Sequence, residues 1–231
     1  VATYFIIQEL EQQAIDKKVS QEQSDYKMSY YGDGSVKAKV KIVDGKREGK
    51  GYNYYTDGKV HSEINYENGI KQGNSTWFFE NGNPYRVTPY LNNLKHGIQK
   101  KYYETGELLA EVPYKNGELQ EGTEEYLKSG KLITDYPSIV VKDWDNTLLR
   151  STYDIDLKLT GDNRVDFRVF DTKTNIEYFI KPTNSGYQRV SFVSIPGTLE
   201  LKETLIVAKF RTNHGNYKLI TKRHKFATGQ E

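Results

Sequence analysis

The chain has 231 residues, of which 33 are basic and 31 acidic, so its formal net charge is +2. This balance lacks the strong positive bias of a nucleic-acid-binding domain, and we expect no DNA or RNA partner. No apolar run approaches the ~20 residues that a membrane-spanning helix needs, so we expect no direct membrane span. The absence of cysteine excludes disulfides, thiolate metal ligands and a cysteine nucleophile.

Two features of the sequence bear on where the protein is located. The chain has no thiol, which is compatible with an oxidising compartment, and it begins at Val1 rather than at methionine. The second feature fits the removal of an N-terminal segment, which would also have carried any lipid anchor. We therefore expect an exported protein of the periplasm or cell surface, with the cytoplasm as the alternative.

Residues 1–27 precede the first recognisable pattern. They are polar after the first few positions, and the stretch from Gln8 to Lys18 is rich in Gln, Glu, Lys and Ala, which favours a short helix. We interpret residues 1–27 as a lead-in segment that covers the first edge of the following sheet.

A 24-residue repeat runs from about Tyr30 to Ile133. Each unit opens with an aromatic pair, carries a glycine three residues later, and has a second turn, usually Asp-Gly or Asn-Gly, eleven residues after that glycine. Self-similarity at a fixed period indicates a repeat architecture. The opening pairs are Tyr30-Tyr31, Tyr54-Tyr55, Phe78-Phe79, Tyr102-Tyr103 and the weaker Tyr126-Leu127.

Each repeat unit has the pattern of a β-hairpin. Asp-Gly and Asn-Gly favour tight turns because both residues tolerate positive φ. Between the turns the residues alternate, as in Val36, Ala38, Val40 and Ile42, with lysines at the positions between them. Period two with one apolar face is typical of a half-buried antiparallel strand. We predict that residues 28–135 form one antiparallel meander, with turns at Gly34, Gly45, Gly58, Gly69, Gly82, Gly106 and Gly117.

The third unit departs from the pattern of the others. Pro84 and Pro89 remove backbone donors from its strand, and Arg86 stands where the other units have Ser or Ala. We expect a bulge, a bend or an irregular edge here. Drift in a tolerant repeat and a re-aimed binding surface are both open as the reason.

The repeat resembles a known family. The motif aromatic-aromatic-x-x-Gly-x-apolar, followed by Asp/Asn-Gly-x-x-x-Gly, resembles the MORN family and, more closely, the bacterial MORN-variant repeats of YwqK-type proteins. Tyr54 to Gly73 and Tyr102 to Gly117 match best. The resemblance implies an extended β-meander used for protein contacts. Some relatives are named as antitoxins, and eukaryotic MORN proteins are linked to membranes and scaffolding.

The repeat stops near Pro137, and residues 136–231 follow a different pattern. About seven strand-like runs are separated by turn signals, and no amphipathic helix is evident. Seven strands in about a hundred residues favour an immunoglobulin-like β-sandwich. The fold class expected for the whole chain is therefore all-β, with an antiparallel MORN-type hairpin sheet followed by a sandwich. The last run is basic and is typical of an edge strand or a contact with an acidic partner.

One segment has a motif of an enzyme family. Ile139 to Leu148 resembles the first motif of haloacid-dehalogenase phosphatases, in which Asp143 would be the nucleophile and Asp145 the acid/base. That fold needs a βαβ sheet, whereas the downstream pattern is antiparallel. The aspartates fit no EF-hand loop and the four histidines have no zinc spacing. We predict no enzyme, no catalytic residue, no metal and no cofactor.

The aromatic residues are the best candidates for a binding surface. A single-layer sheet cannot cover both of its faces, and Trp and Tyr are frequent at interface hot spots. We expect a non-enzymatic protein-binding or scaffold module of a bacterial cell envelope, whose partner is another protein such as a membrane-protein complex. An antitoxin that blocks a toxin is the first alternative, and a phosphatase the second. The predicted partner-binding residues are Trp77, Phe79, Tyr103, Tyr55 and Arg86.

Overall fold

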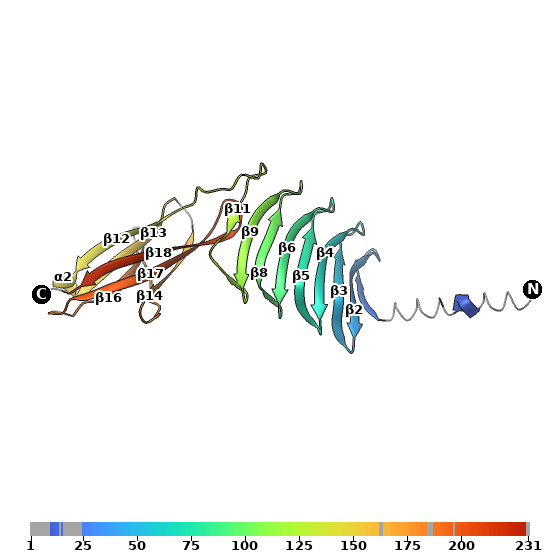
Figure 1. The fold of residues 1–231 in the computed structure, drawn as a ribbon, viewed down its shortest axis with the longest axis horizontal. Coiled ribbons are helices and arrows are strands. Elements are labelled where there is room, and N and C mark those ends of the chain that lie inside the picture. Colours follow the sequence, from blue (N-terminus) through green and yellow to red (C-terminus); the bar gives the residue numbers. More distant parts are fainter. Residues whose placement is uncertain are drawn as a thin grey trace, which may run out of the picture. The chain divides into compact units, whose positions relative to one another are not determined.

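The computed structural model describes residues 10–13, 15, 25–161, 164–183, 187–195 and 197–229. Nearly all of them lie in antiparallel strands and their turns (Figure 1), so the predicted all-β class is confirmed. The chain divides into two compact units, Val1–Glu118 with Lys128–Gly130 and Leu119–Leu127 with Lys131–Glu231. The predicted boundaries after residues 27 and 135 stay predictions. Residues 10–13 and 15 are helical, and the rest of the expected lead-in helix lies outside the described residues.

The first unit is a meander in which successive strands pair antiparallel. Its sheet has the order β1-β2-β3-β4-β5-β6-β8-β9-β10, and the short β7 also pairs with β6. Every predicted turn glycine from Gly34 to Gly117 has a positive φ, which explains why glycine recurs there. The strands are β1 (Tyr26–Tyr30), β2 (Val36–Val43), β3 (Lys46–Tyr54), β4 (Val60–Glu67), β5 (Ile70–Phe78), β6 (Pro84–Leu91), β7 (Leu94–Lys95), β8 (Gly97–Tyr102), β9 (Leu108–Lys115) and β10 (Glu118–Leu119).

The irregularity expected in the third unit lies in the neighbouring strand. Strand β6 is continuous in spite of its two prolines, and its pairing with β5 has a register shift between Trp77 and Phe78, as the corresponding pairs of other units also have. The strand that returns beside it is interrupted at His96 and forms β7 and β8, whereas β3 and β5 are unbroken. Gly97 has φ 105°, and a Cβ at this position would lie 3.2 Å from Pro89 Cγ. Pro89 therefore remains within β6, and the interruption falls in the partner strand, between β7 and β8.

One face of this sheet, which we call the front face, buries small side chains without a second layer above it. Ser62, Ser75 and Thr88 are at most 1% exposed, and Ser75 and Thr88 lie opposite each other in the strand register. Large rings at neighbouring positions provide the cover. A Cβ at Gly51 would lie 3.0 Å from Tyr66 Cε2, so the tyrosine ring rests on the glycine backbone. The opposite side of the sheet is the back face.

The second unit contains two antiparallel sheets that share one apolar core. One sheet has the order β12-β13-β16-β15 and the other β14-β17-β18. Buried residues of both sheets form a single cluster that includes Ile155, Val190, Ile206 and Phe210. The elements are β11 (Glu124–Glu125), β12 (Ile139–Asn146), α2 (Thr147–Arg150), β13 (Thr152–Leu159), β14 (Val165–Asp171), β15 (Lys181–Pro182), β16 (Gln188–Val193), β17 (Glu200–Arg211) and β18 (Tyr217–Thr228).

The strand order of this sandwich bears on the immunoglobulin-like prediction. Lettered A to G from β12 to β18, the two sheets read ABED and CFG, which is the partition of a constant-type immunoglobulin domain. The chain has no cysteine for an inter-sheet disulfide, and Trp144 is 48% exposed rather than central to the core. The immunoglobulin-like assignment stays a prediction. The basic run in β18 does lie at a sheet edge.

We predict that Gly51→Ala destabilises the repeat unit, because the new methyl group would press on Tyr66 and on Val40 Cγ2 at 3.1 Å. Overpacking of this kind costs about 1–3 kcal/mol. Gly32→Ala is the matched control, since a Cβ there meets nothing within 4 Å. Urea unfolding measures both variants. Equal stability of the two would show that the ring over Gly51 moves aside freely.

Candidate functional site: the cationic front face of the repeat sheet

Trp77 and Arg86 lie opposite each other in the register between β5 and β6. The guanidinium carbon of Arg86 is 4.2 Å from the centroid of the Trp77 ring, a cation–π geometry. Both side chains are on the front face and both are half-buried. Continuing across the sheet in the same register, Arg86 pairs with Lys101. The structure thus brings together two of the five residues predicted from the sequence.

A row of alternating cations and tyrosines runs beside this pair on the front face. We call it the cation–tyrosine ladder. Its cations recur every 24 residues, and so do its tyrosines. Each cation lies 4.3–5.1 Å from the ring centroid of a tyrosine on the neighbouring strand. The three pairs are Arg47 with Tyr66, Lys71 with Tyr90, and Lys95 with Tyr114.

Burial and the charge of Arg86 both shift pKa values of groups in the cation–tyrosine ladder. Burial lowers the pKa of Lys95, and the nearby Arg86 charge lowers it further. Burial raises the pKa of Tyr90, and Arg86 partly opposes this shift because a positive charge favours the phenolate. Arg86 is therefore close enough to influence both groups, and its row and the ladder form one electrostatic surface.

The front face also contains buried polar atoms that make no hydrogen bond within the described part of the chain. These are Arg86 Nε and Ser75 Oγ. Ser75 is fully buried and lies in the register between Ile64 and Thr88. Most buried polar groups in proteins are hydrogen-bonded, so two such atoms on one face are a notable local feature. An acceptor at this place would satisfy Arg86 Nε.

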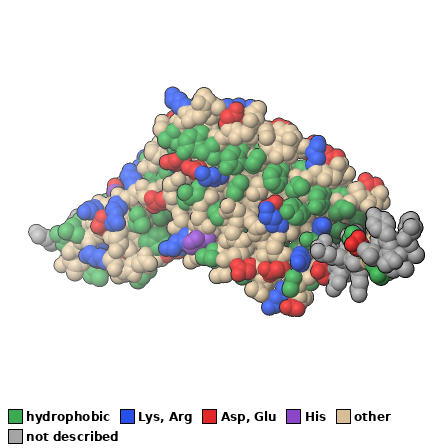
Figure 2. Space-filling model, turned by 45° about the vertical axis from the view of Figure 1, so that its right-hand side comes forward, with side chains coloured by type: hydrophobic (Ala, Val, Ile, Leu, Met, Phe, Trp, Pro, Cys, Tyr) green, Lys and Arg blue, Asp and Glu red, His purple; other side chains and the backbone are tan. Residues whose placement is uncertain are grey.

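The two faces of the sheet differ in charge. In the register of β2 to β9, the front-face positions include five cations and no carboxylate among the described residues. The back face is balanced instead by the ion pairs Lys50–Glu63 (2.8 Å) and Lys100–Glu111 (3.0 Å). On the side of the molecule drawn in Figure 2, hydrophobic side chains are spread among charged ones. The front-face cations are Arg47, Lys71, Arg86, Lys95 and Lys101.

The other three predicted binding residues lie elsewhere, in the column of turns at the ends of the hairpins. The Tyr55 ring is 4.6 Å from the His61 ring, and its hydroxyl donates to Phe78 O at 2.7 Å. The Phe79 ring is 5.2 Å from that of Tyr85. These contacts join residues within a hairpin or tie one repeat to the next. Tyr103 is in the same column and is 5.5 Å from Lys128 Nζ.

The ladder cations were missed by reasoning from the sequence. Attention to aromatic pairs and glycines left the 24-residue recurrence of Arg47, Lys71 and Lys95 unused. The available signal was that recurrence, together with the tyrosines that recur with the same period, twelve places before the next repeat's opening aromatic pair. A periodic cation is easily read as an ordinary solvated residue of a strand.

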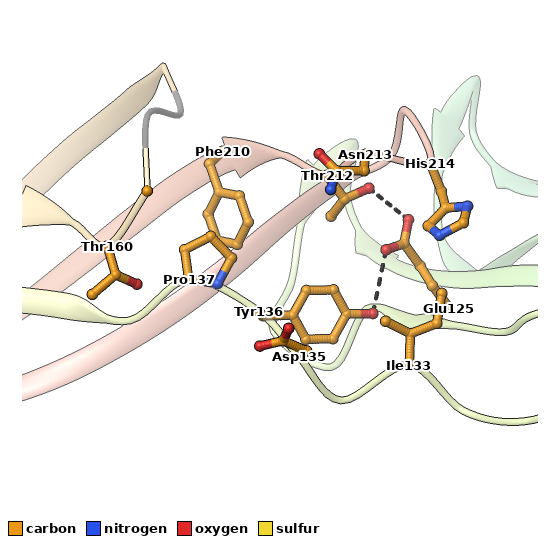
Figure 3. A pocket seen from close by; sticks show the side chains of 11 residues that line it. Glu125, Ile133, Asp135, Tyr136, Pro137, Thr160, Phe210, Thr212, Asn213 and His214 are labelled. Carbon is orange, nitrogen blue, oxygen red and sulfur yellow. Dashed lines mark hydrogen bonds between the residues drawn. The ribbon is translucent and has the colours of Figure 1, made fainter.

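In the second unit, a pocket of about 340 Å³ surrounds Glu125 (Figure 3). The Glu125 carboxylate is fully buried and accepts hydrogen bonds from Thr212 Oγ1 and Asn216 Nδ2 at 2.6 Å each, and from Tyr136 at 3.2 Å. Burial, followed by the Glu125 charge, raises the pKa of Tyr136. The contacts from Thr212 and Asn216 hold β11 to the β17–β18 hairpin, and the contact from Tyr136 holds the following segment to β11. These contacts give Glu125 a structural role.

The two aspartates of the phosphatase-like motif lie near the end of β12. Asp143 Oδ1 is 2.6 Å from His224 Nε2 and accepts from the Tyr153 hydroxyl at 3.1 Å. Asp145 Oδ1 accepts from Thr147 N at 3.0 Å. Strand β12 pairs antiparallel with β13, whereas the phosphatase family requires a parallel sheet. The Asp143–His224 contact, which joins residues 81 apart, was not foreseen.

The strongest ion pair of the sandwich is on the outer side of β13. Arg189 Nε and Nη2 donate to the two oxygens of Asp156 at 2.6 and 2.8 Å, and Trp144 Nε1 donates to the same carboxylate at 2.8 Å. The hydrogen bonds from Arg189 are the main reason why the pKa of Asp156 is lowered. The Asp156 carboxylate on β13 therefore links this strand to Trp144 of β12 and to Arg189 of β16.

The described residues contain no group of three or more His, Asp or Glu residues placed to hold a metal ion. None of the helices formed by the described residues is long and apolar enough to cross a bilayer.

Comparison with known proteins identifies the repeats. The family model described as "MORN repeat variant" matches residues 47–68, 71–92 and 95–116. The chain therefore contains three MORN-variant repeats, as the sequence motif predicted. MORN repeats are commonly protein-binding or scaffold modules, and the family is generally non-catalytic. No curated protein matches the chain.

We predict opposite effects for two exchanges in the turn column. Tyr31 and Tyr55 each donate to a carbonyl 23 residues later, and Phe79 has no hydroxyl for the equivalent bond to Tyr102 O. A net hydrogen bond contributes about 0.5–1.5 kcal/mol. Tyr55→Phe should lower the free energy of unfolding of the repeat unit by this amount, and Phe79→Tyr should raise it. Thermal unfolding measures both, and a Phe79→Tyr variant no more stable than the wild type would contradict the prediction.

We also predict that Asp156 makes the stability of the sandwich depend on pH. Its folded pKa is below the unfolded value of about 3.9, so its stabilising effect is complete above that value. The effect is lost as pH falls through the lower, folded pKa. Asp156→Asn should be less stable than the wild type at pH 7 and should lose less further stability on acidification. Urea unfolding between pH 7 and pH 3 tests this, with the exposed Asp166→Asn as control; an unchanged acid slope would contradict it.

Proposed function

We propose that the chain is a non-enzymatic protein-binding module whose partner docks on the front face around Trp77 and Arg86. The observation that carries the proposal is the stacked Trp77–Arg86 pair, half-buried on a face that has five cations and no carboxylate among its described positions. The presence of three MORN-variant repeats supports a role in protein contacts.

The chemistry of this pair suits an interface centre. Trp and Arg are among the residues most enriched at binding hot spots, where they are desolvated by the partner. The guanidinium carbon of Arg86 is 4.2 Å from the centroid of the indole ring, and this contact limits the side-chain freedom that would be lost on binding. Its Nε is buried and has no hydrogen-bond partner in the described chain, so an acceptor from another protein would reach it only if the Arg86 side chain moved.

We further propose that this module acts in a bacterial cell envelope after export, with another protein, such as a membrane-protein complex, as its partner. The absence of cysteine supports this location. The antitoxin alternative has support from the family resemblance alone. The phosphatase alternative has less support, because Asp143 is engaged by His224 and Tyr153 in an antiparallel sheet.

The proposal predicts that Trp77→Ala weakens partner binding selectively. Truncation of a hot-spot aromatic costs about 2 kcal/mol or more in binding free energy. The partner is first identified by affinity capture from the source cells and is then purified, so that its dissociation constant can be measured for each variant. Arg86→Ala should weaken binding in the same way.

Tyr52→Ala is the matched control, since Tyr52 is a half-buried aromatic residue on the back face of β3. It should change the melting temperature without changing the dissociation constant. Phe79→Ala and Tyr103→Ala test the turn column separately. If Trp77→Ala binds as the wild type does, or if Tyr52→Ala weakens binding equally, the docking surface is not the front face.

A further inference from the structure

We propose that the cation–tyrosine ladder binds an acidic protein segment in the polyproline II conformation, with a carboxylate at every third residue. This inference rests on the proposed function and specifies the chemistry of the partner at the same face. It follows from the spacing, the charge and the aromatic rings of the ladder, which are independent features of the structure.

Spacing gives the first argument. Arg47, Lys71 and Lys95 stand on β3, β5 and β7, so each cation is two strands from the next. Adjacent strands are about 4.8 Å apart, which places successive cations about 9.6 Å apart. A polyproline II helix rises about 3.1 Å per residue and has three residues per turn, so every third side chain points the same way about 9.3 Å further on. Carboxylates at those positions would match all three cations.

Other backbone conformations fit the row less well. Side chains in a β-strand alternate, so residues three apart point to opposite sides of the chain. In an α-helix, residues seven apart share a face but are about 10.5 Å apart, and the mismatch grows at each step. The polyproline II repeat stays within about 1 Å of the cation spacing over the two intervals from Arg47 to Lys95.

Charge gives the second argument. Arg47, Lys71, Arg86 and Lys95 have no carboxylate within ion-pair distance in the described part of the chain. The back-face lysines Lys50 and Lys100 each have one. The front face therefore offers unneutralised cations that recur on every second strand, and complementary charge on the partner would fix its register.

The tyrosine rings give the third argument. Tyr66, Tyr90 and Tyr114 alternate with the cations, and aromatic-lined grooves are the usual docking surface for proline-rich chains. Because the cations lie over these rings, the prolines of a polyproline II segment would pack beside the cation–tyrosine pairs, between two acidic residues. Because the segment is already extended before binding, little conformational entropy is lost when it docks.

The density of charge favours a protein over a nucleic acid. Phosphates follow one another at about 3.4 Å along each strand of a duplex, so a row of cations about 9.6 Å apart would leave most of them unpaired. The net charge of +2 also provides no general attraction for a polyanion. Nucleic acids and anionic lipids are therefore outcomes of the test rather than parts of the proposal.

The test uses the full chain and a synthetic peptide with four Glu-Pro-Pro units. A second peptide of the same composition has the glutamates in adjacent pairs, so it has the same charge but the wrong spacing. Titration calorimetry or fluorescence anisotropy at low and moderate salt gives the dissociation constants. We expect the regularly spaced peptide to bind more tightly than the paired one, and its binding to weaken as salt is raised.

The matched variants separate the ladder from general charge. The ladder variant combines Arg47→Gln, Lys71→Gln and Lys95→Gln, and should weaken binding about tenfold, as expected for three modest ion pairs. The control variant removes three cations from the back face and should stay within about twofold of the wild type. Its changes are Lys37→Gln, Lys41→Gln and Lys115→Gln. Lys71→Gln alone serves if the ladder variant fails to fold.

Several results would overturn the proposal. They are equal affinity for the two peptides, equal loss in ladder and control variants, or no binding of the regular peptide at millimolar concentration. Tighter binding of oligothymidylate, or of vesicles of phosphatidylglycerol and phosphatidylcholine, that is lost in the ladder variant would assign the row to another class of partner. If the peptide fails but Trp77→Ala still abolishes binding of the native partner, the proposed function stands and only the partner chemistry is wrong.

Discussion

The structure of the first unit depends on one constraint: a sheet that is a single layer thick must cover its own faces. Among the described residues no second sheet of this unit lies over Ser75 or Thr88, yet both are fully buried. Small side chains leave room above the sheet for tyrosine rings of the neighbouring strand, as Gly51 does for the ring of Tyr66. The cations then lie over the tyrosines. The arrangement that stabilises the sheet is thus also the one that places positive charge on its surface.

The second unit meets the same requirement by ordinary means. Its two sheets cover each other, so their inner faces are mainly apolar, as Ile155, Ile206 and Phe210 show. Polar groups are confined to the outer side and the ends, where Asp156 and Glu125 are held by several donors each. Such groups secure the strands of the sandwich.

Much of the fold could be predicted because it is encoded locally. Glycines at fixed spacing required positive φ, and period-two alternation required strands, so the hairpins followed from neighbouring residues. The effect of Pro89 fell on the adjacent strand at His96, since strand pairing transmits a local change sideways. The ladder and the Asp143–His224 contact could not be predicted in this way. Both depend on which strands lie side by side, and alternation within one strand does not specify that.

The repeat also determines how the surface can change over evolution. Each unit adds two strands, one cation and one tyrosine in fixed register, as in Lys71 and Tyr90. Duplication or loss of a whole unit would lengthen or shorten the row by one step and leave the remaining steps in place. The length of the bound segment would therefore change in steps of one hairpin repeat. Such steps arise by gene duplication rather than by point mutation.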